Sequence, residues 1–226
     1  MLMVVEALWP VRAEPSHVLR RWGLHTALFA AALLLTFVGF AANGWLFGAA
    51  DPAVAQGVGV WHLAGMVLAL DALAYGCHVA SHKVPLLWRM HRLHHSDTSL
   101  DVSTIFRQHP GQFFWYLPVM LGAASLMGAS ALEVSIYFAL ERSIQALAHA
   151  NMPVPAWVSR WMGLVMVTPD FHHTHHSPDA HGTDSNYGEL FSFWDRIFRT
   201  GSASVPGRTV FGLNPAPERA AAQPAE

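Results

Sequence analysis

The chain has 226 residues, of which 53% are hydrophobic and only 12% are charged, and its mean hydropathy is +0.29. In soluble domains about a quarter of the residues are charged, so this composition disfavours an ordinary soluble protein. The formal net charge of −2 leaves no basic surface for nucleic acid. The single cysteine, Cys77, excludes an internal disulfide and a Cys-x-x-Cys metal motif, and we expect it to be a small buried apolar residue.

Four apolar runs follow one another along the chain and predict an all-α integral membrane protein with three to four transmembrane helices. Residues 24–47 are enough to cross a hydrocarbon core of about 30 Å, and the run is too long and too internal for a cleaved signal peptide. A second run covers residues 58–77. Residues 113–127 and 132–148 are shorter, so they either cross with local thinning of the bilayer or form a hairpin that enters and returns.

Basic residues flank these runs on one side only. They precede the first run and follow the second, at Arg12, Arg20, Arg21, Lys83, Arg89 and Arg92. The connection between the first two runs contains no lysine or arginine, and neither does the connection between the last two. By the positive-inside rule, both termini and the histidine clusters described below face the cytoplasm, and a bacterial inner membrane is the expected location.

We expect three segments in this organisation. Residues 1–22 form a cytoplasmic N-terminal segment, and residues 23–200 form the membrane domain, which includes a cytoplasmic, helical, histidine-rich di-metal part. Residues 201–226 are rich in alanine and proline, and we expect a disordered tail there that carries no chemistry.

Histidine is the residue type that points to a function. Of the 15 histidines, eight lie in three short blocks: His78-x-x-x-His82, His91-x-x-His94-His95 and His172-x-x-His175-His176. An α-helix brings positions i, i+3 and i+4 to one face, so each block presents its imidazoles on a single side. Imidazole is the commonest metal-binding side chain, and eight rings exceed the needs of one tetrahedral zinc. A lone histidine is more often a surface or capping residue, but internal blocks with a repeated spacing predict a two-metal site and exclude a purification tag.

Two polar stripes on the predicted membrane helices support the same site. Their members repeat at helical spacing and are Asp71, Tyr75, His78 and His82 in the second run, with Glu141, Gln145 and His149 in the fourth. We expect His149 to be a ninth ligand, and we expect the carboxylates of Asp71 and Glu141 to accept the spare ring N–H of ligating histidines. Gln145 is expected to be a weak ligand or a similar support. The alternative is a helix–helix hydrogen-bond seam without any metal.

The histidine blocks belong to a longer pattern. It starts with DALAYGCHVASHKVPLLWRMHRLHHSDTSLDVSTIFRQHP at residues 71–110 and continues with HAN at 149–151, FHHTHHS at 171–177 and NYGELFSFWDRIFRT at 186–200. This ordered series resembles the fatty acid hydroxylase superfamily, and within it the sterol desaturase-like branch, over roughly residues 60–200. The resemblance implies an integral-membrane, non-haem di-iron oxygenase that acts on lipids.

Carried over position by position, the resemblance assigns the metal ligands. They are His78, His82, His91, His94, His95, His149, His172, His175 and His176. Some members of the superfamily have a tenth histidine where this chain has Gln145, and the usual Phe-Gly-Thr tail reads Phe198-Arg199-Thr200 here. His109, before Pro110, occupies a position that the family also tends to fill with histidine, so it either supports a ligand or the substrate or makes a polar contact in a loop.

The resemblance implies a cofactor of two iron ions, and purified protein could carry zinc because affinity alone favours zinc over ferrous iron. No flavin or nicotinamide fingerprint and no attached cytochrome b5 domain is visible, so we expect a separate electron donor of the ferredoxin or cytochrome b5 type, with its reductase. Basic residues that flank the expected metal face, and would steer an acidic carrier, are Lys83, Arg89, Arg92, Arg107, Arg160, Arg196 and Arg199. The alternative is that these charges only set the topology.

The sequence therefore predicts a membrane-bound oxygenase that uses O₂ and external electrons to hydroxylate or desaturate a C–H bond of a fatty acyl, sterol-like or other lipid. A histidine-rich membrane metal transporter is the alternative, but it would place its ligands near the bilayer midplane. A zinc metalloprotease would need a His-Glu-x-x-His helix, which is absent. A metal-binding protein without catalysis leaves the repeated spacing and the apolar runs unexplained. The lipid substrate and the oligomeric state stay open.

Overall fold

The computed structural model describes residues 2–13, 17–47, 59–204 and 210–213. These residues form helices and connecting segments, and in them the only extended pairing is an isolated bridge between Met166 and Phe191. The prediction of a helical protein is confirmed for this part of the chain.

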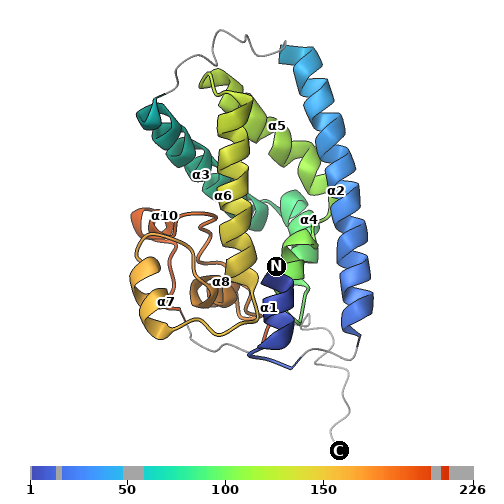
Figure 1. Cartoon of the computed structure of the whole chain (residues 1–226), viewed down its shortest axis with the longest axis vertical. Helices are drawn as coiled ribbons and strands as arrows, with labels where there is room; N and C mark the ends of the chain where they lie inside the picture. The colour runs from blue at the N-terminus through green and yellow to red at the C-terminus, as the bar shows by residue number, and fades with distance from the viewer. Residues whose placement is uncertain (1, 14–16, 48–58, 205–209, 214–226) are drawn as a thin grey trace, which may run out of the picture.

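The described residues form four long helices: α2 (Val18–Phe47), α3 (Val60–Lys83), α5 (Pro110–Leu126) and α6 (Ala131–His149). In Figure 1, α2 and α6 follow the long axis, whereas α3 and α5 slant across the upper half of the view. Apolar side chains of α3, α5 and α6 pack into a common core that includes Leu70, Ala74, Met120, Leu121 and Tyr137, none of them more than 5% exposed. Helix α2 packs against α5 on the outside of this core.

The short helices gather at one end of the long ones (Figure 1). They are α1 (Leu2–Leu8), α4 (Pro85–His95), the 3₁₀ helix η1 (Val102–Phe106), α7 (Ala156–Met162), α8 (Pro169–His175), α9 (Ala180–Thr183) and α10 (Phe193–Ile197). The C-terminal ends of α3 and α6 reach the same part of the molecule.

Local sequence signals explain where the histidine-bearing helices start and stop. Val84 has an extended backbone, and it is both the C-cap of α3 and the N-cap of α4. Pro85 follows at the first position of α4, where its missing N–H costs nothing and its fixed φ suits a new helix. Helix α6 starts with a capping box between Ser130 and Glu133, after Gly128 has turned the chain at a φ of 70°.

Among the described residues, α3 is the one helix that is long and apolar enough to cross a membrane, judged by length and composition. The prediction of three to four membrane helices is therefore not confirmed in number. Helix α2 covers the first predicted run, but the side chains of residues 32–33, 35–37 and 39–47 lie outside the described part. Helices α5 and α6, which match the third and fourth runs, have 17 and 19 residues.

The predicted C-terminal tail falls only partly on described residues. Residues 205–209 and 214–226 lie outside the described part. Phe211 is described and only 5% exposed. Its ring packs edge-on against His173, and the guanidinium of Arg12 lies 4.7 Å from its centre. At this position the chain is thus docked on the body of the protein.

Candidate metal centre

Helix ends bring all nine histidines of the predicted ligand set to one place. His78 and His82 lie in the last turns of α3, His91, His94 and His95 in the last turns of α4, His149 at the end of α6, and His172, His175 and His176 at the end of α8. Eight of these residues are at most 6% exposed, and the side chain of His82 is 1% exposed. The structure brings the three blocks and His149 together, as the sequence predicts.

The nine rings divide into two groups in which one ring nitrogen from every member lies within 4.8 Å of the others. The five-histidine group consists of His78, His82, His91, His95 and His175. The four-histidine group consists of His94, His149, His172 and His176. The groups adjoin, since the rings of His95 and His176 stack with centroids 4.5 Å apart. Two neighbouring nitrogen-lined positions result.

Within each group the inward ring nitrogens crowd together. In the four-histidine group, Nε2 of His149 lies 3.2 Å from Nε2 of His94 and 3.1 Å from Nε2 of His172. In the five-histidine group, the Nε2 atoms of His78 and His91 are 3.2 Å apart. Neighbouring ligands of one ion at bond lengths of about 2.0–2.1 Å would be separated by about 2.9–3.4 Å. The spacing fits ligands that share a metal.

The outward ring nitrogens determine the hydrogen positions. Nδ1 donates to the backbone carbonyl of Tyr187 from His78 (2.9 Å), of Gln145 from His149 (2.7 Å) and of Ser185 from His175 (2.6 Å). A carbonyl oxygen only accepts, so Nδ1 carries the hydrogen and Nε2 of a neutral ring keeps its lone pair.

Converging lone pairs repel one another unless a cation lies between them. In the described part of the chain, the buried Nε2 atoms of His82, His95 and His175 also have no hydrogen-bond partner. Buried nitrogens of this kind are costly when unpaired. The donor set therefore fits metal ions, because ions bound to these nitrogens would satisfy both the shared and the unpaired atoms.

Burial keeps the imidazoles on α4 and at the end of α8 neutral. Loss of hydration, reinforced by the neighbouring rings, holds the pKa of His94, His95, His172, His175 and His176 well below the usual value. The same causes lower the pKa of His91 to about 3. A neutral imidazole is the form that binds a metal ion, so the site is ready to bind at physiological pH.

A sequence model of the fatty acid hydroxylase family matches residues 63–200, which is more than half of the chain. The chain belongs to the fatty acid hydroxylase family. The matched residues include all nine histidines of the two groups. The predicted family resemblance is confirmed.

Several curated proteins of this family are similar to the chain. It is 31% identical to the alkylglycerol monooxygenase of Danio rerio over 68% of this chain and 32% of that protein. It is 26% identical to the human alkylglycerol monooxygenase over 68% of this chain and 33% of that protein. It is 31% identical to the ornithine lipid hydroxylase OlsE of Rhizobium tropici over 60% of this chain and 40% of that protein. The chain thus spans about a third of the length of the alkylglycerol monooxygenases, and no solved structure matches it.

Two carboxylates that the sequence analysis did not single out face histidine rings of the centre. Oε1 of Glu189 lies 3.1 Å from Nδ1 of His78, and Oδ1 of Asp184 lies 3.5 Å from Nδ1 of His82. Burial alone would raise the pKa of Glu189, but His78 and then Arg142 outweigh it and hold that pKa below its usual value. Glu189 directly follows the Asn-Tyr-Gly motif, and this adjacency is the one signal that could have found it.

Asp71 holds the segment that carries Glu189 and does not touch a histidine of the centre. Its carboxylate accepts hydrogen bonds from the backbone N–H of Leu190 (3.0 Å) and Phe191 (3.1 Å) and from the indole of Trp194 (2.8 Å). The expectation that Asp71 accepts from a ligand ring is therefore not what the structure shows. Asp71 therefore affects the ligands only indirectly, through the segment that carries Glu189.

Glu141 and Gln145 also differ from the expected contacts. The buried carboxylate of Glu141 pairs with the adjacent Arg142, at 2.6 Å from Nη2. The side-chain amide of Gln145 donates from Nε2 to the backbone carbonyl of Glu189 at 2.6 Å, so it supports the carboxylate-bearing segment. The expected support of His149 by Gln145 exists, but it comes from the backbone carbonyl.

His109 is not brought to the centre. It is exposed and serves as the N-cap of α5, where its Nδ1 accepts from the backbone N–H of Gly111 at 3.0 Å. Of the two interpretations left open for His109, the loop contact matches this geometry. Asx, Ser and Thr are the usual N-caps, and a histidine in this role gives no distinctive sequence signal.

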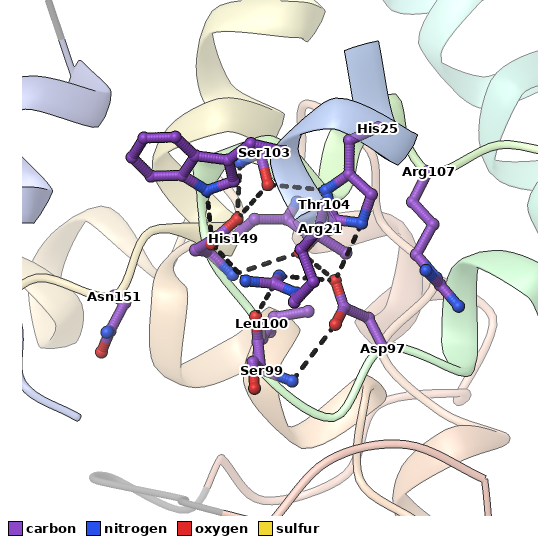
Figure 2. Close-up of polar contacts among 12 residues, drawn as sticks. Arg21, His25, Asp97, Ser99, Leu100, Ser103, Thr104, Arg107, His149 and Asn151 are labelled. Carbon is purple, nitrogen blue, oxygen red and sulfur yellow. Dashed lines mark hydrogen bonds and ion pairs between the residues drawn. The ribbon is translucent and has the colours of Figure 1, made fainter. Parts of the chain in front are cut away.

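A buried ion-pair network lies beside the four-histidine group (Figure 2). The guanidinium of Arg21 in α2 bonds the carboxylates of Asp97 (2.9 Å) and Asp101 (2.8 Å), and Figure 2 shows Asp97 turned toward Arg21 and His25. Arg21 is 7% exposed and Asp97 is 3% exposed. Burial raises the pKa of Asp97, but the Arg21 contact outweighs it and lowers that pKa. Arg21 therefore has a structural partner in addition to any effect on membrane topology.

Proposed function

We propose that the chain is a membrane-bound, non-haem di-iron oxygenase that oxidises a C–H bond of a lipid with O₂. The observation that carries the proposal is the pair of adjoining, buried histidine groups with converging ring nitrogens. The relatives named as alkylglycerol monooxygenase and ornithine lipid hydroxylase favour hydroxylation over desaturation. Both named substrates are lipids, which supports the lipid class without choosing a member.

Nine neutral imidazoles would hold two iron ions, and the iron pair would supply the redox chemistry that reduces O₂ and puts one oxygen atom into the substrate. The protein's part is to hold the ring nitrogens in place and to keep water away. Backbone carbonyls fix the tautomers of His78, His149 and His175, which leaves each Nε2 free to bind. Affinity alone favours zinc over ferrous iron, so zinc in a purified sample would not identify the working metal.

The membrane arrangement is also part of the proposal. We propose that α3 spans the bilayer together with α2, α5 and α6, and that the histidine end faces the cytoplasm. Large apolar side chains at the opposite end of these helices support this, since Trp61 is 86%, Leu126 92% and Leu132 70% exposed. Such exposure is unfavourable in water and suits lipid. A lipid chain would then reach the centre from the bilayer.

Electrons would come from a separate protein. Hydroxylation with O₂ consumes two electrons, and the described residues present no nucleotide-binding arrangement of strand and helix. Lys83, Arg89 and Arg92 are exposed on and next to α4, close to the histidine rings in the sequence. We propose that an acidic carrier of the ferredoxin or cytochrome b5 type binds at this basic surface.

Metal transport fits the geometry less well. A transport site has to release its ion, and transporters hold substrates near the bilayer midplane. Here the groups have five and four donors each and lie at the ends of the long helices. A donor set this complete favours a resident cofactor.

The test is a comparison of lipid extracts by mass spectrometry. Cells that express the wild-type chain, together with a carrier and reductase, are compared with cells that express the His175→Ala variant. We expect a lipid that gains one oxygen atom with the wild type only. A lipid that loses two hydrogen atoms would indicate desaturation in place of hydroxylation. Identical lipid extracts would overturn the proposal.

A further inference from the structure

Carboxylates are unevenly distributed around the two histidine groups. In the five-histidine group, Glu189 faces Nδ1 of His78 at 3.1 Å and Asp184 faces Nδ1 of His82 at 3.5 Å. The side chain of Glu189 is only 16% exposed. Asp184 is 47% exposed and also pairs with Lys83 at 3.1 Å, so solvent and the lysine screen its charge. Glu189 is therefore the stronger of the two anions.

The four-histidine group has only neutral partners in the described part of the chain, whereas the other group combines the two carboxylates with neutral partners of His78, His91 and His175. Nδ1 of His149 donates to a backbone carbonyl, and Nδ1 of His94 lies 3.2 Å from the side-chain amide of Gln108. The Nδ1 atoms of His172 and His176 have no hydrogen-bond partner in the described part of the chain.

Asp97, a carboxylate that acts on His149 of this second group, is already committed elsewhere. Asp97 bonds Arg21 and accepts from the hydroxyl of Thr104 at 2.8 Å (Figure 2). The positive charge of Arg21 offsets its negative charge, so Asp97 adds little net anionic field to the four-histidine group.

The backbone that carries Glu189 is held in place from both sides. Its backbone carbonyl accepts from the amide of Gln145, and the next residue, Leu190, donates its N–H to Asp71. On the other side, the N–H of Gly188 donates to Asp195 at 2.8 Å. A side chain on a backbone fixed in this way needs little rearrangement to share the N–H of His78 with the carbonyl of Tyr187, which makes the contact effective.

We propose that the two groups hold their metal ions unequally, and that Glu189, acting through His78, is the positioning residue that makes the five-histidine group the tighter one. A carboxylate bonded to the spare N–H of a ligating imidazole fixes its orientation and raises its basicity, and loss of such a partner typically lowers metal affinity about 10- to 100-fold. The five-histidine group also has one more nitrogen donor, which likewise strengthens its hold on the metal ion. Metal should therefore leave in two steps, first from the four-histidine group.

The inference rests on the di-metal centre proposed above, and it is tested with metal alone. The full chain, purified in detergent and loaded with Zn²⁺ to two ions per chain, is mixed with an excess of a chromogenic chelator. We expect two phases of one ion each, with the second at least about tenfold slower. A single phase for both ions would overturn the proposal, whatever any variant does.

Substitutions show which histidine group releases each ion and whether Glu189 slows the release. His176→Ala should eliminate the fast ion, and His175→Ala should accelerate the slow one. Glu189→Gln keeps the size of the side chain but removes its charge, so the slow phase should quicken about tenfold or more while the fast phase stays unchanged. Glu189→Asp should restore part of the difference. An unchanged slow phase in a folded Glu189→Gln protein, or a slow ion lost with His176→Ala, would contradict the assignment.

Glu133→Gln is the matched control. Glu133 is also a buried glutamate beside a histidine, with Oε1 2.9 Å from Nδ1 of His62, but it lies at the opposite end of α6. Its substitution should leave both phases as in the wild type. Unequal release from a chain that oxidises no lipid would sustain this inference and overturn the proposed oxygenase, whereas equal release from an active oxygenase would do the reverse.

Discussion

Nδ1 of His149 donates a hydrogen bond to the backbone carbonyl of Gln145, 2.7 Å away and one helical turn earlier in α6. The side chain of the same glutamine donates to the backbone carbonyl of Glu189. Gln145 therefore connects a member of the four-histidine group with the carboxylate that supports the five-histidine group. It does this as a framework residue, with its backbone serving one group and its side chain the other.

The Gln145→Ala substitution separates these two contacts. The backbone carbonyl stays, so His149 keeps its tautomer and the four-histidine group keeps its metal. The lost amide leaves the buried carbonyl of Glu189 without its donor, which costs about 1–3 kcal/mol of unfolding free energy. Thermal and denaturant unfolding in detergent would measure the loss, and elemental analysis would count the metal. A variant that is fully stable but binds only one metal per chain would mean that Gln145 is a ligand.

Two histidines at the end of α8, His173 and His176, test which rings bind metal. His176 belongs to the four-histidine group, whereas His173 lies outside both groups and packs against Phe211. His176→Ala should lower the metal content from about two ions to about one per chain and eliminate lipid oxidation. His173→Ala should lose stability through a cavity but keep both ions. Equal metal loss in the two variants would show that stability, and not ligation, controls metal content.

Neighbouring arginines on α2 separate a structural role from a topological one. Arg21 is buried between Asp97 and Asp101, whereas Arg20 is exposed. Arg21→Met leaves two buried carboxylates without their partner and should lower the unfolding free energy by about 3–5 kcal/mol. Arg20→Met removes the same charge from the same flank and should cost less than about 1 kcal/mol. Similar unfolding free energies for the two variants would mean that Arg21 only directs membrane topology.

The proposed external electron donor predicts that turnover depends on a carrier. Purified iron-loaded protein with lipid, O₂ and NADPH alone should show no turnover, and a carrier with its reductase should start it. The rate should fall as salt is raised, because exposed charges are screened within about 10 Å at 0.1 M. Sustained turnover with NADPH and no second protein would contradict the external-donor proposal.

Charge reversal at the basic surface locates the carrier. Arg92→Glu changes an exposed residue of α4 that is not a member of either histidine group. It should raise the KM for the carrier several-fold and leave the metal content at two ions per chain. Val4→Glu, on α1, changes an exposed residue and serves as a control for a general effect of added negative charge. If Arg92→Glu leaves the KM unchanged, the basic residues serve topology alone.

The sequence by itself determined the helical class, the family and the nine histidines that meet in the structure. This was within reach because spacings of three and four residues place side chains on one helix face regardless of the rest of the fold. The division into groups was not within reach. His94 and His95 are neighbours in α4, yet they belong to different groups, and the same holds for His175 and His176. Successive side chains on a helix point about 100° apart, so adjacent ligands can serve different ions.

Tertiary structure alone decided which acids support the rings. Helix spacing favoured Asp71 because it shares a face with His78, but that carboxylate bonds the chain at Leu190 and Phe191. Glu189, which is 111 positions after His78 in the sequence, occupies the place next to its ring. The partner of an outward ring nitrogen depends on how a distant irregular segment folds back over the helix ends, and local periodicity carries no information about such long-range contacts.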